Sequence, residues 1–144
     1  MPVLKTFLVE DSPVIRENLA AALEEMVPLQ VVGHAEDEPG ALQWLQNPPA
    51  PCDIIILDLF LRQGSGLNVL RRLSDARQRQ DGARKRPAPR CVVLTNYATD
   101  EMRRQCLQLG ASRVFDKSGE IEDLIDYCLA LADEAGPREG RLDA

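Results

Sequence analysis

Short apolar segments alternate with amphipathic segments along the chain, and this alternation limits the possible folds more than any other feature. Residues 3–9, 29–35, 52–57, 91–95 and 112–115 are rich in branched aliphatic side chains, which predicts five strands. After each of them, apolar residues recur at steps of three and four, which predicts five helices. We therefore expect a (βα)5 chain, an α/β fold with a doubly wound, five-stranded parallel sheet.

The predicted helices begin and end at residues with known capping preferences. Ser12 is a favourable N-cap and Pro13 a favourable first residue, so a helix should begin there and stop before Pro28. Its expected buried positions are Ile15, Leu19, Leu23 and Met26. Gly110 should end the helix that begins at residue 100. Four consecutive apolar residues at 54–57 are typical of a central strand with helices on both faces.

Composition places the chain among globular domains. Its 144 residues are 44% hydrophobic and 28% charged, with a formal net charge of −6. We expect one domain at 1–135 and a flexible tail at 136–144, with the arginine-rich stretch 77–90 forming a mobile loop. The acidic balance argues against nucleic-acid binding by this domain alone. A signal peptide and a membrane-spanning apolar run are not seen in the sequence, so a cytoplasmic location without membrane contact is expected.

The cysteines and the single histidine do not form a metal-binding pattern. No C-x-x-C pair is present, so buried reduced thiols are favoured over a zinc site. The four cysteines are Cys52, Cys91, Cys106 and Cys128. His34 lies within a predicted strand, and we expect a structural role for it rather than one in phosphoryl transfer.

Polar side chains collect where the predicted strands end. Glu10 and Asp11 follow the first strand, Asp58 follows the third, Thr95 ends the fourth and Lys117 follows the fifth. In an open parallel sheet, ligands bind outside the carboxyl ends of the strands. If the first strand lies beside the third, these side chains share one crevice. Each of them alone has an ordinary structural explanation, and only their joint placement indicates a site.

Three neighbouring carboxylates repel one another unless one of them is protonated or a cation lies between them. Oxygen ligands of this kind suit Mg²⁺, which keeps several waters and binds phosphoryl oxygens. Lys117 would then pair with Asp58 or with an arriving phosphoryl group. An aspartate beside Mg²⁺ and a lysine can accept a phosphoryl group, because positioning and charge neutralisation are most of what such a transfer requires.

Five positions in this order, on a chain of alternating strands and helices, resemble the receiver domain of bacterial response regulators, in the CheY-like superfamily. They are Glu10, Asp11, Asp58, Thr95 and Lys117. The resemblance covers about the whole chain and implies a flavodoxin-like fold with strand order 2-1-3-4-5. It also implies a phosphoacceptor domain of a two-component or phosphorelay system, stand-alone or cut from a longer regulator, and not an enzyme acting on other molecules.

The resemblance assigns roles to single residues. Asp58 would take the phosphoryl group from a histidine kinase or a histidine phosphotransfer protein. Asp11, Asp58 and the backbone carbonyl of Phe60 would bind Mg²⁺, and Glu10 would act through water. A two-state shift of the fourth helix, fifth strand and fifth helix would control a downstream protein partner, an output domain or a homodimer. The residues that would bind the phosphoryl oxygens are Thr95 and Lys117.

Several positions depart from the family pattern. Where the family often has an aromatic residue three positions before the lysine, this chain has Val114, with Phe115 next to it. Ser118 replaces a common proline, so we expect a trans peptide bond before it. Phe60 and Tyr97, two residues beyond Asp58 and Thr95, should flank the path of attacking water, and we hypothesise that their rings slow hydrolysis of the acyl phosphate.

Three other functions remain open at this point. A receiver-like docking scaffold that is never phosphorylated would keep the fold without the chemistry. A Mg²⁺-dependent phosphatase would commonly place a second aspartate two residues after the first, where this chain has Phe60. A flavodoxin-like FMN binder would need a neutral phosphate-binding loop after the first strand, where Glu10 and Asp11 would repel the phosphate.

Overall fold

The computed structural model describes residues 3–46, 52–79 and 89–142, with the backbone alone at 76–79 and 135–142. Strands and helices alternate strictly along the described chain, as predicted. The strands are β1 (Leu4–Val9), β2 (Leu29–Ala35), β3 (Ile54–Leu57), β4 (Arg90–Thr95) and β5 (Arg113–Asp116). The helices are α1 (Pro13–Met26), α2 (Glu38–Gln46), α3 (Gly66–Arg79), α4 (Asp100–Gln108) and α5 (Ile121–Leu142).

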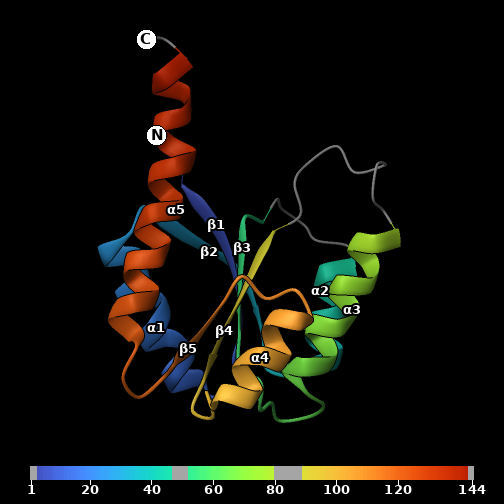
Figure 1. Ribbon diagram of the computed structural model, residues 1–144. Coiled ribbons are helices and arrows are strands. Elements are labelled where there is room, and N and C mark those ends of the chain that lie inside the picture. The colour runs from blue at the N-terminus through green and yellow to red at the C-terminus, as the bar shows by residue number, and fades with distance from the viewer. Residues whose placement is uncertain (1–2, 47–51, 80–88, 143–144) are drawn as a thin grey trace.

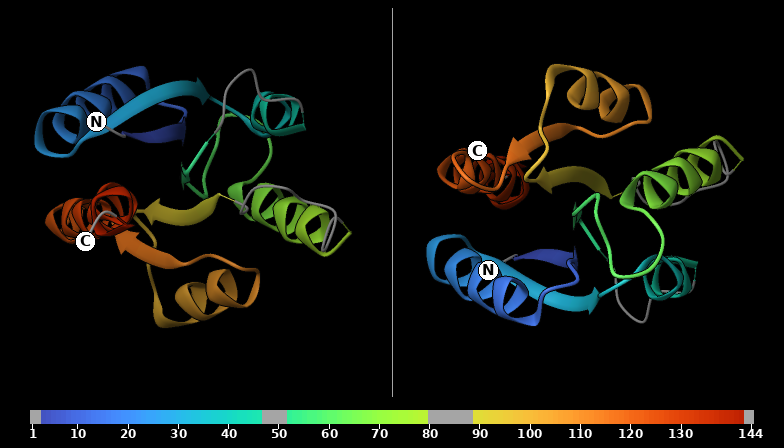
Figure 2. Two further views of the ribbon diagram at one scale, coloured as in Figure 1. Left: turned by 90° about the horizontal axis from the view of Figure 1, so that it is seen from above. Right: turned by 90° about the horizontal axis from the view of Figure 1, so that it is seen from below.

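All five strands pair in parallel, in the order β2-β1-β3-β4-β5. This confirms the doubly wound sheet and the expected neighbourhood of β1 and β3. Val9 pairs with Leu57, and Leu57 pairs with Val93 on the other side. Because the strands run in one direction, the polar residues that follow them lie at the same end of the sheet. This end of the sheet faces the viewer in the view from below (Figure 2).

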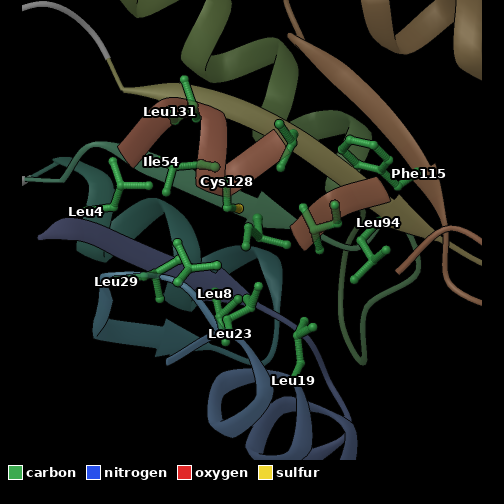
Figure 3. Close-up of a cluster of buried hydrophobic side chains, with 14 residues drawn as sticks. Leu4, Leu8, Leu19, Leu23, Leu29, Ile54, Leu94, Phe115, Cys128 and Leu131 are labelled. Carbon is green, nitrogen blue, oxygen red and sulfur yellow. The ribbon is translucent and has the colours of Figure 1, made fainter. Parts of the chain in front are cut away.

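The helices form a layer on each face of the sheet. Figure 1 shows α1 and α5 on one side and α2, α3 and α4 on the other. Alternate residues of β3 enter two separate apolar cores: Ile54 and Ile56 pack toward α1 and α5, while Ile55 and Leu57 pack toward the other three helices. The first core is drawn in Figure 3. All four side chains of β3 are buried, which confirms the prediction of a strand covered on both faces.

The capping residues behave as predicted. Ser12 is the N-cap of α1, and its hydroxyl accepts a hydrogen bond from the Ile15 amide at 3.3 Å. Gly110, just after α4, has a φ of 105°, a left-handed conformation that favours glycine. The peptide bond before Ser118 is trans, as are the other described peptide bonds.

Some sequence predictions are wrong at the ends of elements. Leu19 and Leu23 of α1 are buried, but Ile15 and Met26 are 42% and 56% exposed, so only the middle of the predicted stripe contacts the core. The loop predicted at 77–90 is shorter at both ends, because α3 runs to residue 79 and β4 begins at residue 90. Residues 80–88 lie outside the described chain. The backbone of α5 is helical to Leu142 and so overlaps the tail predicted at 136–144, whose flexibility stays a prediction.

Buried thiols agree with the expectation from composition. Cys91, Cys106 and Cys128 are buried, and Cys52 is half-buried. Burial raises the pKa of Cys52 and of Cys128 to about 12. His34 is exposed on the edge strand β2. None of the described helices is both long enough and apolar enough to cross a membrane.

Candidate functional site

Three carboxylates meet where β1 and β3 end. Glu10 and Asp11 follow β1, Asp58 follows β3, and one oxygen from each lies within 4.8 Å of the others. Glu10 is only 3% exposed and Asp58 only 6%, whereas Asp11 is half-buried. Among the described residues this is the one group of acidic, cysteine or histidine side chains with the spacing of a metal site. The structure thus brings together the three carboxylates that the sequence placed in one crevice.

Lys117 supplies the positive charge of the site. Its Nζ donates hydrogen bonds to Asp58 Oδ2 at 2.8 Å and to Glu10 Oε1 at 2.5 Å. Burial alone would lower the pKa of Lys117, but its hydrogen bonds to the two carboxylates outweigh burial and raise it. Burial also raises the pKa of Glu10, against the opposing effect of the Lys117 ammonium. The single Lys117 ammonium therefore lies among three carboxylates, and it cannot neutralise all of their negative charge.

Backbone and side-chain hydrogen bonds hold the carboxylates in place. The Asp58 amide donates to the Val9 carbonyl at 3.0 Å, which fixes the end of β3 against β1. Asp58 Oδ1 accepts from the Phe60 amide at 3.3 Å. Glu10 Oε2 accepts from the Ser12 amide at 3.1 Å. These bonds satisfy carboxylate oxygens that burial would otherwise leave without partners.

The segment after Asp58 turns back closely on itself. The Gly66 amide donates to the Leu59 carbonyl at 2.9 Å, and Phe60 and Ser65 form an isolated antiparallel bridge. An ideal Cβ at Gly66 would lie 2.1 Å from the Asp58 carbonyl oxygen. Only glycine permits this approach, so Gly66 sets the path of the chain immediately beside the Asp58 carboxylate.

Thr95 lies at the end of β4 and is fully buried. Its hydroxyl accepts a hydrogen bond from the Tyr97 amide at 3.2 Å, and its carbonyl accepts from the Lys117 amide at 2.9 Å. Thr95 is therefore connected to the lysine through the backbone. Phe60 and Tyr97 are 51% and 58% exposed, and their rings contact each other with centroids 4.5 Å apart. The two aromatic residues form an exposed pair beside the acidic site.

Val114 and Phe115 face opposite sides of the sheet. Val114 packs in the core under α2, α3 and α4, whereas Phe115 packs in the core under α1 and α5 and contacts the Tyr127 ring, with centroids 5.9 Å apart. Phe115 is 1% exposed. It does not take the place of the missing aromatic residue at position 114, because adjacent residues of a strand point in opposite directions.

Four charged residues around the site were missed by the sequence analysis. Arg16 donates to the Glu10 carbonyl at 3.2 Å, and Arg103 donates to Glu120 at 2.9 Å. Glu38 accepts from the Ser65 amide at 2.9 Å. The contacts of Glu38 with Ser65 and of Arg103 with Glu120 span 27 and 17 residues, and the contact of Arg16 with Glu10 joins a helix to the end of the preceding strand, so helical spacing does not reveal them. Of the four residues, Glu120 alone had a signal in the sequence. It lies four residues after Asp116 and next to the start of a helix, where an acidic residue is common.

The donor set suits a small, hard divalent cation. Carboxylate oxygens are ligands that Mg²⁺ prefers, and the half-buried Asp11 leaves one side of the group open to water. A cation among the three carboxylates would relieve the repulsion that Lys117 only partly offsets. Glu10, Asp11 and Asp58 could therefore hold Mg²⁺.

Comparison with known proteins gives concordant results. A family model of the response regulator receiver domain matches residues 6–128. DevR/DosR of Mycobacterium tuberculosis, a DNA-binding transcriptional activator, is 33% identical over 110 residues, which are 76% of this chain and 46% of that protein. A protein-glutamate methylesterase of Cupriavidus metallidurans is 30% identical over 138 residues, 91% of this chain and 34% of that protein. The chain spans about half or less of the length of these relatives.

Solved structures share the fold. A response regulator from Burkholderia pseudomallei, solved with a phosphorylated aspartic acid, a calcium ion and citrate, superposes with a TM-score of 0.69 at 24% identity, over 98% of this chain and 75% of that one. The receiver domain of the response regulator NarL of Mycobacterium tuberculosis gives 0.73 at 21% identity, over 92% and 98%. The β2-β1-β3-β4-β5 sheet and the family match over residues 6–128 lead to one conclusion: this chain belongs to the receiver domains of the response regulators, which act in two-component signalling.

Proposed function

We propose that Asp58 accepts a phosphoryl group in a Mg²⁺-dependent reaction, and that this modification is the signal which the domain passes on. The observation that carries the proposal is the placement of the Asp58 carboxylate, which is buried beside two further carboxylates and bonded to Lys117 at 2.8 Å. A buried carboxylate with a cation partner and an adjacent acidic group suits nucleophilic attack on phosphorus.

The transfer balances without a further reactant. A carboxylate oxygen of Asp58 forms a bond to phosphorus while the bond from phosphorus to the donor breaks, and the donor leaves with the electron pair. The donor is a phosphohistidine of a histidine kinase or histidine phosphotransfer protein, or a small acyl phosphate. Mg²⁺ held by Glu10, Asp11 and Asp58 would neutralise the phosphoryl oxygens. Lys117 is already hydrogen-bonded to Asp58 and so stands where a second positive charge is required.

The remaining site residues have supporting roles in this proposal. Thr95, whose hydroxyl oxygen accepts from the Tyr97 amide, would donate its hydroxyl hydrogen to a phosphoryl oxygen, because a dianion is a strong acceptor. The backbone carbonyl of Phe60 would complete the metal ligands. The exposed ring pair Phe60 and Tyr97 would restrict the approach of water and slow loss of the phosphoryl group.

The partners on either side of the reaction follow from the family. We propose a histidine kinase or phosphotransfer protein upstream, and downstream a protein partner, an output domain or a second copy of the chain. The matched relatives include a DNA-binding activator and a methylesterase, so receivers of this kind serve different outputs. A phosphatase acting on other molecules is less well supported, since the position two residues after Asp58 carries an apolar ring.

The test is intact-protein mass after incubation with acetyl phosphate, with and without Mg²⁺, on the native chain and on Asp58→Asn. We expect the native chain to gain one phosphoryl group only with Mg²⁺, and Asp58→Asn to gain none. Asp53→Asn is the matched control, because Asp53 lies at the opposite end of β3 and bonds the Lys5 amide at 2.8 Å. The control should be phosphorylated normally. If the native chain gains nothing, even from candidate phosphotransfer proteins, it acts as a docking scaffold instead.

A further inference from the structure

One arginine of α4 joins three segments around the site. Arg103 Nε donates to the Ala98 carbonyl at 3.0 Å, Nη1 donates to the Val114 carbonyl at 2.9 Å, and Nη2 donates to Glu120 Oε1 at 2.9 Å. Ala98 belongs to the β4–α4 loop, Val114 to β5 and Glu120 to the β5–α5 loop. All three nitrogens of the side chain thus bond to different parts of the chain.

Two of these segments lead directly to residues of the candidate site. Ala98 lies three residues after Thr95, and Glu120 lies three residues after Lys117. The third contact is to Val114 of β5, the edge strand that lies between these two loops in the sequence. Figure 1 shows α4 beside β5. The hydrogen bond from Arg103 to the Val114 carbonyl links this helix to the edge strand. A displacement of either site residue along its loop would be transmitted to Arg103.

The loop that carries Lys117 is closed on itself by short hydrogen bonds. Glu120 Oε1 accepts from the Asp116 amide at 2.8 Å, and the Glu120 amide donates to the Asp116 carbonyl at 2.8 Å. The Ser118 amide donates to Asp116 Oδ1, also at 2.8 Å. These bonds make residues 116–120 a compact unit, so we expect Lys117 and Glu120 to move together.

A planar guanidinium constrains its partners more than a flexible ammonium does, because its donors are fixed in one plane. Arg103 and Glu120 are 32% and 34% exposed, so the pair is partly shielded from solvent. At position 114 the side chain is a small buried valine, and the Val114 carbonyl is held by Arg103. The link between β5 and α4 at this point is therefore a charged hydrogen-bond network.

We propose that Arg103 is the positioning residue that couples the phosphoryl site to α4, through its bonds to the Thr95 and Lys117 loops. This inference rests on the proposed phosphorylation of Asp58. A phosphoryl group on Asp58 would draw Lys117 away from its present bonds to the two carboxylates. Glu120 would move with the loop and shift Arg103, and with it α4, whose outward face includes Arg104 and the half-exposed Leu107.

The test measures amide hydrogen exchange of α4, residues 100–108, by mass spectrometry before and after phosphorylation with acetyl phosphate and Mg²⁺. The intact mass of every sample reports how much protein is phosphorylated. Arg103→Met removes the three bonds but keeps an apolar stem, and Arg103→Lys keeps the charge without the planar donors. Arg104→Met is the matched control on the exposed neighbouring position. Thermal unfolding of each variant shows whether it folds.

We expect phosphorylation to change α4 exchange in the native chain and in Arg104→Met. In Arg103→Met and Arg103→Lys the change should fall at least fivefold at equal phosphorylation. Glu120→Ala removes the bond from the other residue of the pair and serves as the test if Arg103→Met does not fold. It should reduce the phosphorylation-dependent change in α4 exchange to the same extent. The double variant Glu120→Ala with Arg103→Lys should show no further reduction.

Two outcomes would overturn the proposal alone: a native chain that is phosphorylated without any change in α4 exchange, or Arg103 and Glu120 variants that keep the full change. Absence of a phosphoryl group on the native chain would instead overturn the proposed function, and this inference with it. The intact mass distinguishes that failure before any exchange is measured.

Discussion

Replacing Gly66 by alanine would place a methyl group against the backbone of the segment that follows Asp58. An ideal Cβ at Gly66 lies 2.1 Å from the Asp58 carbonyl oxygen and 2.7 Å from the Leu59 Cα. Real Cβ atoms essentially never approach closer than 3.0 Å, so the backbone must shift by at least 0.9 Å. The atoms that would clash with the new methyl group belong to the backbone, so they cannot rotate away as the end of a flexible side chain would.

The expected cost follows from two opposing effects. Overpacking of this kind costs about 1–3 kcal/mol, whereas alanine in place of glycine stabilises by about 0.4–1 kcal/mol through the unfolded state. We therefore expect Gly66→Ala to lower the free energy of unfolding by about 1–2 kcal/mol, which corresponds to roughly 2–8 °C in Tm for a chain of this size. Asp58 moves with the displaced backbone, so its phosphorylation should also slow by roughly tenfold to a hundredfold.

Urea unfolding and the rate of phosphorylation by acetyl phosphate measure these two effects. Gly119→Ala is the matched control, since an ideal Cβ there meets no atom within 4 Å. It should unfold at the native midpoint or slightly above it. Equal midpoints and equal phosphorylation rates for the two variants would refute the reasoning that the close approach at Gly66 positions Asp58.

Three further predictions concern other parts of the molecule. In Gly33→Ala the new Cβ would lie 2.6 Å from Trp44 Nε1, so the only tryptophan should leave its stacked position on Phe7 and its fluorescence should shift to the red; an unchanged spectrum would contradict this contact. Cys128, with a pKa raised by burial to about 12, should react with iodoacetamide at pH 8 roughly a thousandfold more slowly in the folded chain than in urea, because less thiolate is present; similar rates would contradict the burial. Once phosphorylated, Phe60→Asn and Tyr97→Ala should lose the phosphoryl group faster than the native chain, and unchanged half-lives would show that the ring pair does not restrict water.

The central part of the site could be predicted from the sequence because it depends on strand direction. Each strand was recognisable as an apolar segment, and parallel strands bring their C-terminal flanks to one edge. The contacts of Lys117 with Glu10 and Asp58 span 107 and 59 residues, yet they follow from this rule alone. The fold and the meeting of these charges were therefore predictable, while the roles assigned to the single residues remain predictions.

Other features depend on tertiary contacts, which the spacing of apolar residues in the sequence does not reveal. Ile15 and Met26 fit the helical spacing of Leu19 and Leu23, but spacing does not show how far the packing partner extends along the helix. The contacts of Arg103 with two loops and a strand likewise arise from tertiary structure. A lone arginine on an amphipathic helix is more often a solvated residue than a bridging one.

The strand order also divides the site into two levels of local stability. Glu10, Asp11 and Asp58 follow β1 and β3, and each of these strands has neighbours on both sides. Lys117 follows β5, which is bonded to one strand only, so local unfolding there disrupts fewer contacts. The three carboxylates are thus attached to the inner strands of the sheet, and the lysine follows its edge strand. If a phosphoryl group is added to Asp58, the loop after the edge strand β5 can rearrange around its charge while β1 and β3 remain folded.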